Sequence, residues 1–276
     1  MARGARPVDR YRSRRRGGGL PAWLSVLGIL ALLGAAGATV WVVLRQMRSD
    51  AVDAATLCPL DGATGLTAIL LDMTDPLGAT QALALRAKLD ALVLGSPRGT
   101  LVALGRVSDR PQDLGATFAL CRPMTGREGG DAIRNSAQLD RRFQAGFLQP
   151  FHAQIAALLD AQPAKASPIM EGLQAMLSGV AALPVAEGAP RRVTIVSDLL
   201  QHSDAMSFYR GEDWGAFQAS PQFARLARNL DGVAVSVLRV PRPGARVDAS
   251  AVDDFWVRYL EAQGAASVDV ASLGDL

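Results

Sequence analysis

Short apolar runs alternate with longer stretches of helical spacing along residues 65–276. The runs are almost continuously apolar, which is typical of strands buried on both faces of a sheet. They lie at 66–72, 100–107, 115–121, 192–198, 233–240 and 267–270. Helical spacing is found between or beside them at 79–94, 139–159, 167–183, 218–230 and 251–262. Strands that alternate with helices predict an α/β domain with a doubly wound, mostly parallel six-stranded sheet.

Two neighbouring runs differ from this parallel pattern. Only a short link joins the runs at 100–107 and 115–121, so we expect these two strands to be antiparallel neighbours. The following segment, 122–138, is rich in glycine and mixed in charge, and we expect it to be a loop insertion.

Residues 20–44 contain no charged side chain and are mostly apolar. A stretch of this length can span the ~30 Å hydrocarbon core of a bilayer with some tilt to spare. Trp23 and Trp41 lie near its two ends, where indole rings favour the headgroup region. We therefore expect a transmembrane helix at 20–44, a short polar stalk at 45–64 and the α/β domain at 65–276.

Arginine is concentrated before this span. Residues 1–19 hold seven arginines and one aspartate, a net charge of +6, while the whole chain carries +3, so residues 20–276 carry −3. The positive-inside rule then predicts a single-pass protein of the inner (cytoplasmic) membrane, with a cytoplasmic Arg-rich tail and a periplasmic or otherwise extracytoplasmic domain. A cleaved signal peptide is the alternative, but apolar sequence continues past the small residues at 34–38 and favours an uncut signal anchor. The folded part has no basic stripe that would indicate nucleic-acid binding.

Both cysteines, Cys58 and Cys121, follow the span. An even number of cysteines in an exported domain predicts one disulfide, whereas in a cytosolic protein we would expect two buried thiols. Because bridged Cα atoms lie within ~7 Å of each other, the segment with Cys58 must fold back across the second strand to reach Cys121.

Polar side chains that are suited to a ligand follow the first apolar run. Asp72 ends this run, and Thr74 and Asp75 come shortly after it. In open α/β sheets ligands gather beyond the carboxyl ends of the strands. Carboxylate and hydroxyl oxygens are the donors that Mg²⁺ or Mn²⁺ prefers. The same residues also suit a strand followed by an Asp/Thr helix cap and a turn at Pro76, so this segment alone leaves both interpretations open.

Two further segments carry the same chemistry. Asp198 ends another apolar run, and its strand is a candidate neighbour of the strand that Asp72 ends. Ser167 opens a helix, and we expect it to be the N-cap, with Pro168 at the first helical position and Glu171 reaching back to complete a capping box. Each feature is common by itself, but their order and spacing together are more specific.

This combination resembles the von Willebrand factor A (VWA) domain family. That family has a six-stranded, doubly wound sheet with one antiparallel edge strand. Its metal-ion-dependent adhesion site uses Asp-x-Ser-x-Ser after the first strand, a Thr from a later loop and an Asp after the fourth strand. Asp72 and Thr74 match the first aspartate and the first hydroxyl. Ser167 resembles the threonine, Asp198 resembles the last aspartate, and the resemblance covers roughly 66–271.

One position departs from the motif of that family. Pro76 stands where the second serine would be, and it has no hydroxyl to offer. Either Asp75 supplies an oxygen instead, or the site is a degenerate one that no longer binds metal. The resemblance thus implies a Mg²⁺ or Mn²⁺ site with a fixed set of ligands. These are Asp72, Thr74, Asp75, Ser167 and Asp198.

The leading functional hypothesis is a membrane-anchored, exported domain of VWA type that binds another envelope or exported protein. The resemblance implies that a carboxylate of the partner completes the coordination of the cation. The loop after Asp198 lies on the same rim and is rich in residue types found at interface hot spots. Its candidate partner-binding residues are His202, Phe208, Tyr209, Arg210 and Trp214. The alternative is that the aromatic side chains pack beneath their own loop.

Two other functions remain open. A structural envelope domain with a vestigial site would show the same sequence pattern. A Mg²⁺-dependent phosphatase of haloacid-dehalogenase type also places a nucleophilic aspartate after a buried first strand. Its motif needs a second aspartate two residues later, where this chain has Thr74, and Lys165 is the only candidate for its loop lysine. We therefore expect that the protein is not an enzyme.

Overall fold

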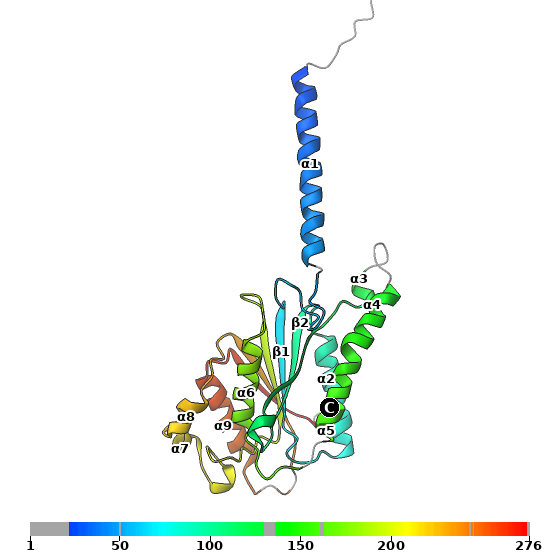
Figure 1. The fold of residues 1–276 in the computed structure, drawn as a ribbon. Helices are drawn as coiled ribbons and strands as arrows, with labels where there is room; N and C mark the ends of the chain where they lie inside the picture. Colours follow the sequence, from blue (N-terminus) through cyan, green and yellow to red (C-terminus); the bar gives the residue numbers. More distant parts are fainter. Residues whose placement is uncertain are drawn as a thin grey trace, which may run out of the picture. The chain divides into compact units, whose positions relative to one another are not determined.

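The computed structural model describes residues 22–49, 51–129, 136–160, 163–242, 244 and 246–274 (Figure 1). The chain divides into two units, Met1–Arg48 and Ser49–Leu276, each described here by itself. The Arg-rich tail predicted at 1–19 lies outside the described residues.

Helix α1 (Ala22–Ser49) is 28 residues long, and all of it except Ser49 belongs to the first unit. This helix includes most of the uncharged segment 20–44 and continues through 45–49, the beginning of the predicted stalk. Among the residues that the structure describes, no helix was found that is long and apolar enough to cross a membrane.

The second unit is built on one six-stranded sheet with the strand order β3-β2-β1-β4-β5-β6. The strands are β1 (Gly65–Leu71), β2 (Thr100–Arg106), β3 (Gly115–Cys121), β4 (Arg191–Ser197), β5 (Val233–Arg239) and β6 (Ser267–Ser272). All neighbours are parallel except β2 and β3, which are antiparallel. The predicted six-stranded, mostly parallel sheet and its antiparallel pair are confirmed, and this mixed sheet fits a VWA-like fold.

Helices cover both faces of the sheet (Figure 1). One face carries α2 (Ala79–Leu94), α4 (Ser136–Phe143), the π-helical turn η2 (Gln144–Leu148) and α5 (Gln149–Leu159). The other face carries α6 (Ile169–Ala181), α7 (Trp214–Gln218), α8 (Pro221–Leu226) and α9 (Ala249–Ala262). Ile69 of β1 enters the first core and Leu70 the second. Because alternate residues of β1 are buried on opposite faces, the strand is almost entirely apolar, with Thr67 as its one polar side chain.

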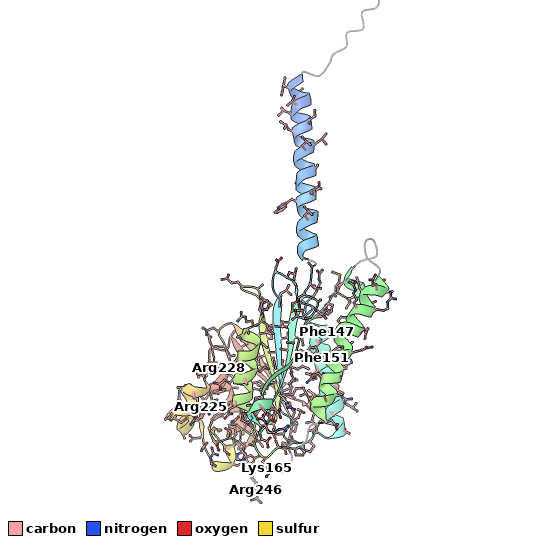
Figure 2. All side chains as sticks on the ribbon, viewed as in Figure 1. Phe147, Phe151, Lys165, Arg225, Arg228 and Arg246 are labelled. Carbon is pink, nitrogen blue, oxygen red and sulfur yellow. A yellow bond between two sulfur atoms is a disulfide. The ribbon has the colours of Figure 1, made fainter. Side chains whose placement is uncertain are left out.

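Aromatic rings fill the core beneath η2 and α5. Phe147 and Phe151, labelled in Figure 2, stack with their centroids 6.3 Å apart. Phe118 of β3 meets Phe151 edge-on at 5.8 Å. The edge strand β3 is therefore fixed to the helical layer as well as to β2.

Two expected elements were partly wrong. The helix predicted at 218–230 is shortened to α8, because Pro221 suits the first helical position and begins the helix there. The short helix α7 lies before it, mostly in the segment that was predicted as a loop. The predicted loop insertion at 122–138 contains the short helix α3 (Gly126–Gly129) and the first residues of α4, while 130–135 lie outside the described residues.

Residues 51–64, the remainder of the predicted stalk, fold back along one end of the sheet. The N–H of Cys121 donates to the carbonyl of Thr56 at 2.8 Å, and the N–H of Thr64 donates to the carbonyl of Gly99 at 3.0 Å. Cys58 and Cys121 form a disulfide, with their Cα atoms 4.7 Å apart. The predicted disulfide is confirmed, together with the fold-back across β2 that it required.

Candidate functional site

Asp72 follows β1 directly and lies beside the end of β4. Its N–H donates to the carbonyl of Val196 at 2.8 Å, so the pairing of β1 with β4 continues one residue past the strand. The residue is only 4% exposed. A buried carboxylate requires hydrogen-bond donors around it, since it has lost its contact with water.

Three hydroxyl groups supply these donors. Thr74 donates to Oδ1 of Asp72 from Oγ1 at 2.7 Å and from its N–H at 3.2 Å. Ser167 and Ser197 donate to Oδ2 from their Oγ atoms, at 2.9 and 2.7 Å. The structure thus brings two predicted residues, Thr74 and Ser167, onto Asp72. It adds Ser197, the last residue of β4, which the sequence analysis missed.

Ser167 is held in place by its main chain and not by a helix cap. Its N–H and carbonyl pair with the carbonyl and N–H of His202, both at 2.9 Å. The predicted capping box is wrong, because Pro168 is the N-cap of α6 and no side chain caps it. The hydroxyl of Ser167 serves the buried carboxylate of Asp72 instead. Glu171 does not reach back but accepts hydrogen bonds from the loop after β4.

Asp198 begins the loop after β4. Its Oδ1 accepts from the N–H of Leu200 at 2.9 Å. Burial raises the pKa of the Asp198 carboxyl, and the negative charge of Asp72 raises this pKa further. The next residue, Leu199, has a φ of 66°, a left-handed conformation that costs roughly 1–2 kcal/mol in a residue with a side chain. Trp256 fixes it by donating from Nε1 to its carbonyl at 2.8 Å.

Arg242, in the loop after β5, completes the cluster. Its Nε donates to Oδ2 of Asp198 at 3.0 Å, and its Nη1 donates to the carbonyl of Pro76 at 3.0 Å. Its Nη2 lies 3.7 Å from Oδ2 of Asp75. One guanidinium therefore joins the loops after β1, β4 and β5. The sequence analysis missed Arg242, although its place just after the strand next to β4 was a signal of the kind used for Asp198.

The expected metal site is formed only in part. Asp72, Thr74 and Ser167 converge, as hard oxygen donors for a divalent cation would. Asp75 and Asp198, the other predicted ligands, both face Arg242. Within the described parts of the chain, no group of three or more His, Cys, Asp or Glu side chains is arranged to hold a metal ion. Hydroxyl and carboxylate oxygens thus converge at Asp72, while a guanidinium stands at the other two predicted ligands, and the metal site stays a prediction.

The five predicted partner-binding residues fall into two groups. Phe208 and Trp214 pack beneath their own loop against Phe255 of α9, with ring centroids 5.1 and 5.7 Å apart, so the interior position that the sequence analysis kept as an alternative is the one observed. Tyr209 is 60% exposed. The remaining two are an exposed Arg210 and a half-buried His202.

Two residues of this loop, the half-buried His202 and the exposed Tyr209, border the cluster around Asp72. The rings of Tyr209 and His202 meet edge-on at 5.3 Å. Partial burial raises the pKa of Tyr209, and the carboxylates of Asp198 and Asp75 raise this pKa further, which places the phenol within their field. A recess of about 480 Å³ also opens beside Thr74. We call His202, Tyr209 and Arg210 the rim.

No protein family model and no curated protein matches the chain. Among solved structures, the chain is similar to an aerotolerance-related membrane protein from Bacteroides fragilis with multiple mutations to serine (12% identity over 75% of this chain and 90% of that chain, TM-score 0.37). It is similar to the conserved hypothetical protein BatB from Bacteroides thetaiotaomicron (14% identity, 75% and 90%, TM-score 0.34). It is also similar to the pilus adhesin SpaC from Lactobacillus rhamnosus GG in an open conformation (13% identity, 76% and 28%, TM-score 0.40). At these values no property of the chain follows from the three proteins.

Proposed function

We propose that the chain is a membrane-anchored, exported domain of VWA type that binds another envelope or exported protein and is not an enzyme. The observation that supports this most is the buried hydrogen-bond cluster of Asp72 at the carboxyl ends of β1 and β4. Ligands of open α/β sheets bind at this edge. The cluster fixes the loops that present the rim, and an interface fixed in advance loses less entropy when it binds.

The membrane part of the proposal is based on the sequence. Residues 20–44 carry no charge, and seven arginines precede them. This asymmetry supports a cytoplasmic N-terminus and an extracytoplasmic domain in a single-pass protein of the cytoplasmic membrane. A reporter fused after Leu276 should then be active only if it works outside the cytoplasm. Activity of a cytoplasm-only reporter at that position would contradict the proposed orientation.

Catalysis by Asp72 receives no support from its surroundings. Both oxygens of its carboxylate accept hydrogen bonds, and the residue is almost inaccessible to a substrate. A phosphatase of the haloacid-dehalogenase type would need one carboxylate oxygen of Asp72 to be exposed, so that it could attack the substrate as a nucleophile. Thr74 stands where its general acid would be and donates to Asp72.

A divalent cation is left out of the proposed function. When bound, Mg²⁺ or Mn²⁺ would supply a positive centre for a carboxylate of the partner, and Asp72, Thr74 and Ser167 would be its nearest ligands. Because Arg242 already engages the other two predicted ligands, we propose that the partner contacts the rim directly.

Site-specific photo-crosslinking tests the rim in the full-length, membrane-embedded chain. A photoreactive phenylalanine replaces Tyr209, which is 60% exposed, or Leu83 of α2, which is 68% exposed, as a matched control. We expect position 209 to yield one defined crosslinked protein and position 83 to yield none. The alternative function, a structural envelope domain with a vestigial site, predicts no product that is specific to position 209.

A further inference from the structure

We propose that Arg242 is the resident cation of this site and takes the place of the divalent metal that the sequence led us to expect. All three nitrogens of its guanidinium face oxygens at the sheet edge. Nε and Nη1 donate to Asp198 and to the carbonyl of Pro76, both at 3.0 Å, and Nη2 lies 3.7 Å from Asp75. The planar fork of an arginine suits several fixed acceptors at once, and its charge is permanent at any physiological pH.

The oxygens that a metal would need already have donors. Oδ1 and Oδ2 of Asp72 accept from three hydroxyls, and Oδ1 and Oδ2 of Asp198 accept from Leu200 and Arg242. In the described part of the chain, the buried side-chain atoms that lack a partner all lie outside this cluster. Mg²⁺ demands near-octahedral coordination by oxygen, so the hydroxyls would have to turn away from Asp72 and Arg242 would have to leave Asp198. It would also be repelled by the guanidinium beside Asp198.

The departure from the family motif and the presence of Arg242 fit each other. Pro76 removes the hydroxyl that a metal would use, and its carbonyl accepts a hydrogen bond from Arg242. The arginine thereby joins the loop after β1 to the loops after β4 and β5, a cross-link that a bound cation would otherwise provide. The side chain is 22% exposed, so the cross-link is partly shielded from water and salt.

Because Arg242 already joins the loops after β1, β4 and β5, the site keeps the same conformation when no metal is added. The inference does not depend on the proposed function, because it concerns the resting protein whether or not a partner binds to the rim. It implies that neither stability nor binding at this edge of the sheet responds to millimolar Mg²⁺ or to a chelator.

Binding of Mn²⁺ to the full-length chain in detergent tests this inference, with free Mn²⁺ measured by electron paramagnetic resonance. Wild type should bind no Mn²⁺ in a saturable way. Arg242→Ala releases Asp75 and Asp198 and should gain one saturable Mn²⁺ site. Adding Asp198→Asn to that variant should remove the gained site. Arg246→Ala is the matched control, because Arg246 is an exposed arginine of the same loop, labelled in Figure 2, and this change should gain nothing.

Two results would overturn the inference. One is a saturable Mn²⁺ site in wild type that Asp198→Asn abolishes. The other is a folded Arg242→Ala variant that binds no more Mn²⁺ than wild type does. If Arg242→Ala does not fold, Arg242→Gln removes the charge while it keeps much of the side-chain volume, and the same comparison is made with it. Whether wild type itself has a saturable Mn²⁺ site is measured independently of how the Arg242 variants fold.

Discussion

Loss of the Cys58–Cys121 disulfide should destabilise the domain by an amount that its position in the chain determines. The two residues are 63 positions apart. In the chain-entropy model, opening a loop of this length returns about 14 cal/mol/K to the unfolded chain, or about 4 kcal/mol at 25 °C. For a domain of this size, that difference lowers the melting temperature by roughly 9–17 °C.

The native sheet should survive the change, because main-chain hydrogen bonds hold the same segment. Thr56 accepts from the N–H of Cys121, and Thr64 donates to Gly99, whether or not the sulfur atoms are joined. The effect should therefore arise in the unfolded state, which becomes more expanded without the cross-link. The urea m-value should rise for the same reason, since more surface is exposed on unfolding.

The assay is urea unfolding of the oxidised wild type and of the Cys58→Ala/Cys121→Ala variant. Near-ultraviolet circular dichroism reports the packing of Trp256, which is fully buried. The control is wild type that is reduced before unfolding, because it lacks the disulfide bond but keeps both cysteine side chains. A loss below about 1 kcal/mol with an unchanged m-value would refute the reasoning from chain entropy. A native spectrum that collapses in the variant would show that the bond supports the folded sheet itself.

Three further changes have defined outcomes. Asp72→Ala leaves three buried hydroxyls without their acceptor and should cost at least about 1–3 kcal/mol in urea unfolding, the penalty for one unsatisfied buried donor, while a loss below 1 kcal/mol would contradict its role as their shared acceptor. Gly105→Ala puts a Cβ 3.0 Å from Met176 and 3.2 Å from a backbone carbonyl, so it should cost about 1–3 kcal/mol; a neutral result would show that the sheet shifts freely there. Burial alone would raise the pKa of Glu128, but hydrogen bonds from Thr125 and Arg122 outweigh burial and lower it. The contribution of Glu128 is thus present at neutral pH and lost as pH falls through the lowered pKa, and Glu128→Gln should flatten the acid side of the stability profile, which an unchanged profile would disprove.

The strands could be predicted because their burial is visible in the sequence. Every residue of β1 is buried, so the strand is an almost continuous apolar run that ends at Asp72. The helix around 139–159 was also predictable from its spacing, but its π-helical turn at Gln144–Leu148 was not. The start of α8 at Pro221 was missed because apolar spacing continues across the proline and was given more weight than the preference of proline for the first helical position.

The candidate site was predictable only where its signals are local. Asp72 and Asp198 were found because each follows an apolar run, and Ser167 was found with them through the family resemblance. Its interpretation as an N-cap failed because α6 begins one residue later than expected, with Pro168 as the N-cap, and the hydroxyl of Ser167 donates to Asp72, 95 positions away. The ion pair of Arg242 with Asp198 spans 44 positions, so the place of Arg242 just after a strand indicates the sheet edge but not which carboxylate it meets. Contacts of this kind depend on strand order, which only the folded chain provides.

The cluster around Asp72 also determines how late in synthesis and export the site can form. Ser167 and Ser197 are 95 and 125 positions after Asp72, and Arg242 lies 166 positions after Pro76. A chain is synthesised from its N-terminus, and distant contacts form late. If the domain is exported, β1 emerges before the other strands, but Oδ2 of Asp72 lacks its two serine donors until most of the domain has crossed the membrane. A half-translocated chain would thus present no binding edge to a partner, and the arrival of the loop after β5 marks the moment at which the edge is complete.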